Sequence, residues 1–342
     1  MRRSLRTFTP LAALLLVAAA CAAPRQATPT QTATAAGTAA ASATPDFTGR
    51  TLNIVTGGTG GVYIVYGAGL ADMLTKRMKV AASAQSTPAS VDNMKLIRDG
   101  KADVAFTLAD TAYDAVNGTG SFAAPEKKAD AKALAVLYSN LTHIVVEESG
   151  GINGAADLKG KRVSVGSAGS GTEIIANRTL EAYGLDPSKD IQRERLGVQD
   201  SANALRDGKI DAFFFSGGLP VPAILDISTG TKIRLLDLTE SVKKMADKYG
   251  PLYFTIKIPK TTYNTAADVT VSGVANLLVV PSSFDPRLAQ AIIATMIDNK
   301  ADLAKVHVAA NDLTLESATV GSSIDFHQGA IDYYKAKGVW KT

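Results

Sequence analysis

The feature that most constrains the fold is a six-residue pattern that occurs twice. Arg-Asp-Gly-Lys-x-Asp spans residues 98–103 and again residues 206–211, and its second copy begins 108 positions after the first. An apolar run follows each copy. A glycine in this position takes the left-handed conformation that ends a helix, and an unbroken apolar run is typical of a buried parallel strand. Gly100 and Gly208 are therefore expected to end two equivalent helices, each followed by such a strand.

Two glycine-rich stretches repeat at nearly the same offset. VTGGTGGVYIVYGAGLADML (55–74) and VSVGSAGSGTEIIANRTLEAYGL (163–185) each combine a β-branched run, a glycine loop and an amphipathic helix. Two landmarks that share one offset indicate two similar units. Strands that alternate with helices are typical of parallel α/β sheets. The sequence thus predicts an α/β fold of two lobes, each with a parallel-rich sheet flanked by helices.

The order of the segments sets the expected domain boundaries. Lobe two is predicted at residues 143–262. The apolar run 271–280 is interpreted as a strand that crosses back to the first lobe, and C-terminal helices are expected from about Pro286. Lobe one is therefore discontinuous and takes in residues 47–142 and 263–342.

The N-terminus has the pattern of an export signal. Residues 1–20 combine the basic start MRRSLR with a short apolar stretch, which is too short to span a bilayer as a helix. Cys21 follows three alanines, an arrangement that resembles a bacterial lipobox and predicts lipidation of Cys21. Cleavage without lipidation is the alternative. Residues 21–46 are rich in Ala, Thr and Pro and are expected to form a flexible tether. The folded part is then extracytoplasmic, lipid-anchored at the cell membrane or periplasmic.

Charge and glycine spacing argue against nucleic acid and nucleotides. The net charge of +4 includes Arg2, Arg3 and Arg6 of the signal segment, so the rest of the chain has no basic excess typical of a nucleic-acid partner. From Gly58 the dinucleotide fingerprint would need a third glycine where Tyr63 stands, and the P-loop ending G-K-[ST] is absent. No cofactor is expected.

Catalytic motifs are missing as well. The histidines His143, His307 and His327 form no H-E-x-x-H, no G-x-S-x-G is present, and the acidic residues show no paired-carboxylate signature. A single cysteine allows no internal disulfide and no thiolate metal cluster. The sequence predicts a binding protein, not an enzyme, with no metal site, and we expect it to be a monomer.

The candidate binding residues lie where strands meet helices, because ligands of open α/β sheets bind at the carboxyl ends of the strands. The candidates are Gly57, Gly58, Thr59, Gly60, Gly61, Val62, Tyr63, Ser90, Asp110 and Tyr113 from lobe one, and Ser167, Gly169, Ser170, Gly171, Thr172, Glu173, Ser216, Gly217 and Gly218 from lobe two. Other interpretations stay open: the glycine loops as tight turns without a ligand, Ser90 as a helix cap, and Ser170-x-x-Glu173 as a capping box.

The glycine loops favour an anion. A loop of glycines lets a ligand approach the backbone, and the first N–H groups of the following helix have no intrahelical acceptor. No Arg or Lys lies within either loop. We therefore expect a small carboxylate held by helix N-termini and backbone donors.

The ordered set of motifs resembles the TAXI-type solute receptors of TRAP (tripartite ATP-independent periplasmic) transporters. The resemblance covers about residues 51–338 and rests on GGTGGVY, STPASVDNMKLIRDGKADVAFTLADTAYDA, HIVVEESGGINGAADLKGKRVSVGSAGSGTE, RDGKIDAFFFSGGLP and DFHQGAIDYY. It departs from the family at TLAD (107–110) and SGGLP (216–220), which face the cleft and bear on ligand identity.

The resemblance implies a type II periplasmic-binding-protein-like fold. It also implies a receptor that delivers its ligand to a TRAP membrane permease. Family ligands are mostly acidic amino acids such as glutamate, related amino acids or small carboxylates. A ligand-sensing lipoprotein for a signalling receptor and a periplasmic enzyme are the alternatives.

The lipid anchor can be tested directly. Cys21→Ala removes the acylated thiol, and without its acyl chains the protein is expected to leave the membrane fraction for the periplasm or medium. Immunoblots of fractionated cells measure the change. An unaltered distribution would contradict the anchor.

Overall fold

The computed structural model describes residues 46–341, so the predicted signal peptide, Cys21 and nearly all of the tether lie outside the described residues. The strands are β1 (Thr51–Val55), β2 (Ala81–Gln85), β3 (Val104–Leu108), β4 (Ala131–Glu147), β5 (Arg162–Ser164), β6 (Gln192–Glu194), β7 (Ala212–Gly217), β8 (Ile233–Leu235), β9 (Tyr253–Ile258) and β10 (Val269–Pro281). The helices are α1 (Val62–Met78), α2 (Ser90–Arg98), α3 (Ala109–Asn117), α4 (Gly171–Ala182), α5 (Val198–Arg206), α6 (Pro222–Gly230), α7 (Thr239–Tyr249), α8 (Pro286–Asp298), α9 (Lys300–Val306) and α10 (Gln328–Ala336).

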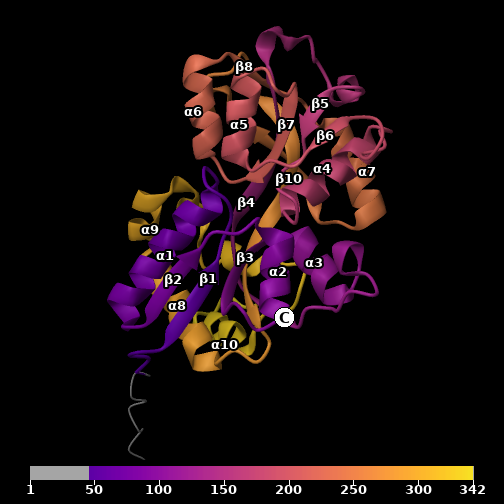
Figure 1. The fold of residues 1–342 in the computed structure, drawn as a ribbon. Coiled ribbons are helices and arrows are strands. Elements are labelled where there is room, and N and C mark those ends of the chain that lie inside the picture. The colour runs from indigo at the N-terminus through magenta and orange to yellow at the C-terminus, as the bar shows by residue number, and fades with distance from the viewer. Residues whose placement is uncertain (1–45, 342) are drawn as a thin grey trace, which may run out of the picture. The chain divides into compact units, whose positions relative to one another are not determined.

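Within residues 46–341 the strands form one ten-stranded sheet around two long central strands (Figure 1). Its order is β2-β1-β3-β10-β4-β7-β5-β6, with β8 beside β4 and β9 beside β10. β1 pairs in parallel with β2 and β3, and β5 pairs in parallel with β6 and β7. The predicted α/β fold with helices flanking a parallel-rich arrangement is confirmed. β4 and β10 continue through both sets of parallel strands and join them into one hydrogen-bonded sheet.

The two central strands owe their length to an almost unbroken buried sequence. β4 and β10 are antiparallel and buried at nearly every position, as expected for strands covered on both faces. β10 pairs with β9 through its first half and with β3 through its second half. The run 271–280 is therefore the crossing strand that the sequence predicted.

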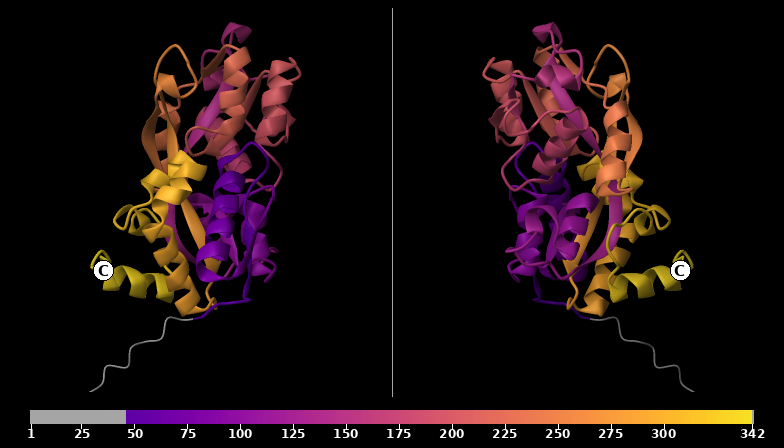
Figure 2. Two further views of the ribbon diagram at one scale, coloured as in Figure 1. Left: turned by 90° about the vertical axis from the view of Figure 1, so that its left-hand side faces the viewer. Right: turned by 90° about the vertical axis from the view of Figure 1, so that its right-hand side faces the viewer.

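The chain leaves one half of the folded part and returns to it. Figure 2 shows the indigo N-terminal elements and the yellow C-terminal elements at the same end, with the magenta and orange middle of the chain at the other. Because β4 contains both Thr142 and His143, the boundary proposed there falls inside a continuous strand. The residue limits of the two lobes stay a prediction. We keep the terms lobe one and lobe two for the groups β1–β3 with α1–α3 and α8–α10, and β5–β9 with α4–α7.

The repeated pattern has the predicted structure in both copies. α2 ends at Arg98 and α5 at Arg206, and Gly100 and Gly208 both have φ +66°. The last residue of the pattern has a further role. Asp103 accepts a hydrogen bond from the Asn53 backbone N–H at 2.7 Å, and Asp211 accepts one from Arg162 N–H, also at 2.7 Å. Each aspartate thus fastens its buried strand to the parallel neighbour, β1 or β5.

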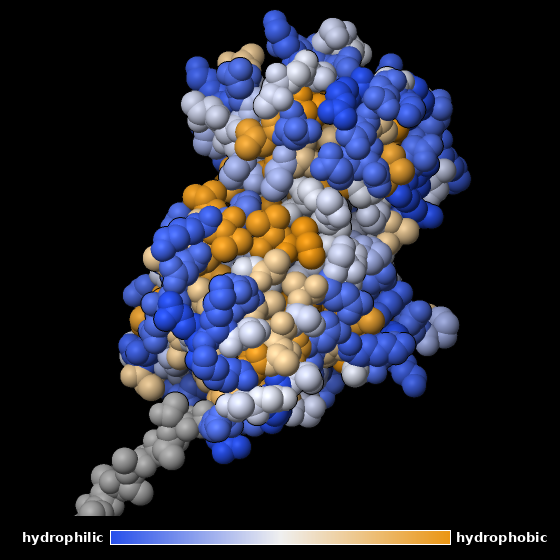
Figure 3. Space-filling model, turned by 60° about the vertical axis from the view of Figure 1, so that its left-hand side comes forward, coloured by the Kyte–Doolittle hydropathy of each residue, from blue (hydrophilic) through white to orange (hydrophobic). Residues whose placement is uncertain are grey.

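The face of the molecule in Figure 3 is mostly polar and has an apolar area near its middle, on the side that carries α1, α6 and α9. Leu225, Val306 and Val308 are among the exposed large apolar residues. No helix within residues 46–341 is both long and apolar enough to cross a membrane.

The left-handed glycines predict a matched stability effect. A β-carbon at Gly208 would meet no atom within 4 Å, so Gly208→Ala is expected to lower the free energy of unfolding only through its positive φ. The expected loss is about 1–2 kcal/mol. Gly230→Ala is the control, because Gly230 also has open space but ends helix α6 without a positive φ. Urea unfolding measures both, and an equal loss in the two variants would contradict this explanation.

Candidate ligand-binding site

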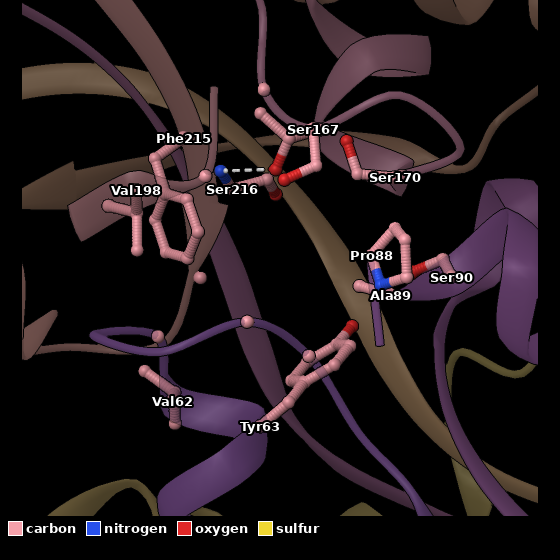
Figure 4. Close-up of a pocket in the computed structure, with 18 of the residues that line it drawn as sticks. Val62, Tyr63, Pro88, Ala89, Ser90, Ser167, Ser170, Val198, Phe215 and Ser216 are labelled. Carbon is pink, nitrogen blue, oxygen red and sulfur yellow. Dashed lines mark hydrogen bonds between the residues drawn. The ribbon is translucent and has the colours of Figure 1, made fainter. Parts of the chain in front are cut away.

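A cavity lies between the helix starts of the two lobes, near the centre of the sheet (Figure 4). It holds about 550 Å³ of space unoccupied by protein atoms, its open mouth included. Its lining comes from the last residues of β3 and β7 and from the loops and helix starts that follow β1, β2, β5 and β6, as expected for strand ends in an α/β sheet. The lining residues are Gly57, Gly58, Gly61, Val62, Tyr63, Pro88, Ala89, Ser90, Leu108, Gly166, Ser167, Ser170, Gly171, Thr172, Gly197, Val198, Phe215, Ser216 and Gly217.

The structure brings most of the sequence-predicted residues to this cavity. Those that line it are Gly57, Gly58, Gly61, Val62, Tyr63, Ser90, Ser167, Ser170, Gly171, Thr172, Ser216 and Gly217. Those outside the lining are Thr59, Gly60, Asp110, Tyr113, Gly169, Glu173 and Gly218. Contact of the first group with a ligand stays a prediction.

The residues outside the lining have other surroundings. Thr59 and Tyr113 are exposed, and Gly218 is buried against the ring of Tyr138. Gly60 touches lobe two instead of the cavity: its carbonyl accepts from Ala223 N–H at 3.2 Å, and a β-carbon there would come within 2.9 Å of the Gln199 amide oxygen.

Asp110 does not line the cavity as the sequence predicted, because it belongs to a buried ion cluster. Its carboxylate is fully buried and accepts from Tyr253 Oη at 2.7 Å and from Arg178 at 3.2 Å. Arg178 also donates to Asp114 at 2.5 Å. Burial raises the pKa of Asp110 against the pull of Arg178. Burial also opposes the charge on Arg178, but Tyr253, Asp110 and Asp114 outweigh it and raise its pKa. The cluster joins α3 of lobe one to α4 of lobe two.

Glu173 is also engaged by hydrogen bonds and ion pairs within the protein. Its backbone N–H donates to Ser170 Oγ at 3.0 Å, which is half of the predicted capping box. Its carboxylate accepts from Gly169 N–H at 3.1 Å, from Arg193 at 2.8 Å and from Arg195 at 2.7 Å. These bonds favour the capping interpretation over a ligand contact.

Sequence reasoning missed part of the lining. The missed residues are Pro88, Ala89, Leu108, Gly166, Gly197, Val198 and Phe215. Gly166 and Pro88 lay inside stretches already singled out. The loop at Gly197 precedes α5 in the same way that the glycine loops precede α1 and α4. The sequence could have identified this loop, because it precedes the helix that ends in the second Arg-Asp-Gly-Lys-x-Asp copy. The equivalent helix before the first copy begins at the candidate residue Ser90.

Five helices of the described chain start at the cavity. The residues just before α1, α2, α3, α4 and α5 are Gly61, Ala89, Leu108, Ser170 and Gly197, and all five line it. The first N–H groups of a helix have no intrahelical acceptor, and its N-terminus carries partial positive charge. None of the lining residues is charged. The cavity therefore offers helix N-termini as hydrogen-bond donors without a cationic side chain in its lining.

The polar side chains around the cavity are neutral at physiological pH. Burial raises the pKa of the Tyr63 phenol well above its usual range. Asn140 Nδ2 donates to Tyr63 Oη at 3.1 Å. Within residues 46–341, Ser216 Oγ, Asn140 Oδ1 and both amide atoms of Asn276 are buried without a hydrogen-bond partner. Buried polar atoms of this kind usually bind water or ligand.

The fold and cavity define a class. An α/β sheet with two long crossing strands and a cavity between two helix-flanked lobes is the type II fold of periplasmic binding proteins. A family model described as the NMT1-like family matches residues 54–338, so the chain belongs to the NMT1-like family.

Two solved structures share this fold at low sequence identity, and a third is reported beside them. A structure described as a periplasmic transporter is 12% identical, with 84% of this chain and 92% of that chain covered and a TM-score of 0.51. A protein from Bordetella bronchiseptica RB50 is 21% identical over 84% of this chain and 89% of that chain, with a TM-score of 0.50. The periplasmic aliphatic sulphonate binding protein SsuA from Escherichia coli is 20% identical over 85% and 94%, with a TM-score of 0.45.

The ion cluster leads to a prediction about stability. Arg178→Leu leaves Asp110 and Asp114 buried without their cation, so the free energy of unfolding is expected to fall by about 3–5 kcal/mol at pH 8. Without the cation, burial holds the folded pKa of Asp110 above its unfolded value. The penalty for this carboxyl is absent at low pH and grows as the pH rises, so the loss is smaller at pH 5.

Urea unfolding at both pH values measures the effect of Arg178→Leu. Arg206→Leu is the control, because Arg206 is exposed and its pair with Asp226 is 3.8 Å long. A loss of about 1 kcal/mol or less is expected there. The buried ion cluster would be contradicted if the two variants lost equal free energy of unfolding, or if Arg178→Leu lost less at pH 8 than at pH 5.

Proposed function

We propose that this protein is an extracytoplasmic solute receptor that binds a small carboxylate or amino acid in the cavity between its lobes. Glutamate-like compounds are the first candidates. The observation that carries the proposal is the convergence of five helix N-termini on a cavity without charged side chains. An anion suits such a site because backbone N–H groups and helix dipoles both favour negative charge.

The expected interaction energies are large enough for micromolar binding. Each helix N-terminus contributes about 0.3–2 kcal/mol to a nearby negative charge. Each neutral hydrogen bond adds about 0.5–1.5 kcal/mol. A few of each offset the cost of ordering the ligand and give micromolar binding, which corresponds to about 8 kcal/mol.

The transport role rests on sequence motifs. The ordered motifs over residues 51–338 resemble TAXI receptors, and on that basis the proposed partner is a TRAP membrane permease. The export signal and Cys21 support a receptor held at the outer side of the cytoplasmic membrane by a lipid anchor. The uncharged cavity supports a receptor function over catalysis, because none of its lining residues is a histidine, lysine or carboxylic acid that could activate the lining hydroxyls.

Calorimetry against L-glutamate, L-glutamine, 2-oxoglutarate and a neutral sugar tests the proposal. At least one acid is expected to bind with micromolar affinity and the sugar to bind weakly or not at all. Tight binding of the sugar and none of the acids would overturn the anion site.

A charge placed in the lining sharpens this test. Gly58 lines the cavity, and a β-carbon there would meet no atom within 4 Å. Gly58→Asp is expected to weaken acid binding by more than about tenfold through repulsion, while the isosteric Gly58→Asn has a smaller effect. Gly58 serves better than Gly60, where a side chain would collide with Gln199 of lobe two.

A further inference from the structure

Four hydroxyl groups in the cavity lining share one arrangement: each accepts a hydrogen bond from an N–H of the protein. Tyr63 Oη accepts from Asn140 Nδ2 at 3.1 Å, and Ser90 Oγ accepts from Leu108 N–H at 3.2 Å. Ser170 Oγ accepts from Glu173 N–H at 3.0 Å, and Thr172 Oγ1 accepts from Ser216 N–H at 3.2 Å. The four hydroxyls belong to α1 and α2 of lobe one, and to α4 and the residue just before it in lobe two. The shared polarity is therefore a property of the cavity as a whole.

This arrangement orients the hydroxyls as donors. A hydroxyl has one proton and two lone pairs, and an N–H that occupies a lone pair leaves the proton to be donated elsewhere. The helix N-termini around the cavity are donors as well. Ser216 Oγ adds a buried hydroxyl without a partner within residues 46–341, and its residue is only 7% exposed. A ligand in the cavity thus meets mainly N–H and O–H groups.

The nearby acids do not reverse this polarity. Asp110 is engaged by Tyr253 and Arg178, and Glu173 by Arg193 and Arg195. Asp92, on α2, lies against Gly169 and outside the lining. An ammonium group needs acceptors or a counter-charge when water is removed from it. No lining residue supplies a carboxylate for that purpose.

The two sides of the cavity differ in character. Figure 4 shows Phe215, Val198 and Val62 on one side, and Ser170, Ser90 and the Tyr63 hydroxyl on the other. The donor side suits a carboxylate, and the apolar side suits a part of the ligand that carries no charge.

We propose that this cavity selects carboxylates whose α-carbon bears no ammonium, such as 2-oxo acids, over the corresponding amino acids. The donor-oriented hydroxyls bind the carboxylate, and Ser216 donates to the 2-oxo oxygen. This inference rests on the proposed function and narrows its ligand class. Asn140 acts as a positioning residue, because it holds Tyr63 with its O–H toward the ligand.

Matched ligand pairs test the selection. The affinities of the full chain for 2-oxoglutarate and L-glutamate, and for 4-methyl-2-oxopentanoate and L-leucine, are measured by calorimetry. In each pair with measurable binding the 2-oxo acid is expected to bind at least about tenfold more tightly, which corresponds to about 1.4 kcal/mol. Equal or tighter binding of the amino acid overturns this inference and leaves the receptor function intact. Absence of binding by all four overturns both.

A substitution of the same shape tests the positioning role of Asn140. Asn140→Asp presents an acceptor to the Tyr63 hydroxyl in place of a donor, so the phenolic proton turns away from the ligand. The affinity for the better 2-oxo acid is expected to fall about tenfold or more, and its advantage over the amino acid to shrink. Ser272→Ala is the control, because Ser272 on β10 is also buried, its hydroxyl has no hydrogen-bond partner within the described part of the chain, and it lies outside the lining.

A second site keeps the test decisive if Asn140→Asp does not fold. Thr172→Val keeps the shape of the side chain but removes its hydroxyl, whereas Thr172→Ser retains the donor. Thr172→Val is expected to weaken 2-oxo acid binding about three- to tenfold, the value of one hydrogen bond, and Thr172→Ser to restore it. Equal affinities for wild type, Thr172→Val and Thr172→Ser would overturn the donor assignment.

Discussion

The antiparallel pairing of β4 with β10 is the interaction on which the rest of the structure depends. These strands pair from Gly273 opposite Leu141 to Pro281 opposite Ala131, and every other strand of the described sheet is placed relative to them. β3 joins β10 at one side and β7 joins β4 at the other, so the carboxyl ends of the parallel strands in both lobes meet near the centre of the sheet. The cavity lies there because α1–α5, the helices that follow those strands, all begin near the centre of the sheet.

In the proposed function, the cavity binds an anion through backbone N–H groups and helix dipoles that the fold holds in place. No cationic side chain then has to be desolvated to bind the anion. The charged side chains nearby pair with one another instead. Arg178 with Asp110 and Asp114, and Glu173 with Arg193 and Arg195, keep their charges outside the lining while they fix α3, α4 and β6 around it. Neutral hydroxyls and backbone groups are left to face the cavity.

Much of this could be predicted from local sequence. The Arg-Asp-Gly-Lys-x-Asp copies predicted a helix end and a buried strand, and the glycines at 100 and 208 have the same left-handed conformation. The glycine loops predicted helix starts at a ligand site, and Gly57, Gly61, Ser170 and Gly171 do line the cavity. These features are local: a left-handed residue or a helix N-terminus is decided by a few neighbouring residues, so it can be recognised in the sequence.

Tertiary structure alone decided what each side chain faces. Asp110 stands just after the end of β3 and Ser216 near the end of β7, yet Asp110 meets Arg178 from the other lobe and Ser216 faces the cavity. Val198 and Phe215 enter the lining although their sequence reads as ordinary core. The orientation of the hydroxyls also depends on distant donors, since Asn140 is 77 residues from Tyr63 and Ser216 is 44 from Thr172. Sequence periodicity determines which residues form an element and which face is apolar, but the partner across the sheet or across the cavity is set by the packing of segments far apart in the chain.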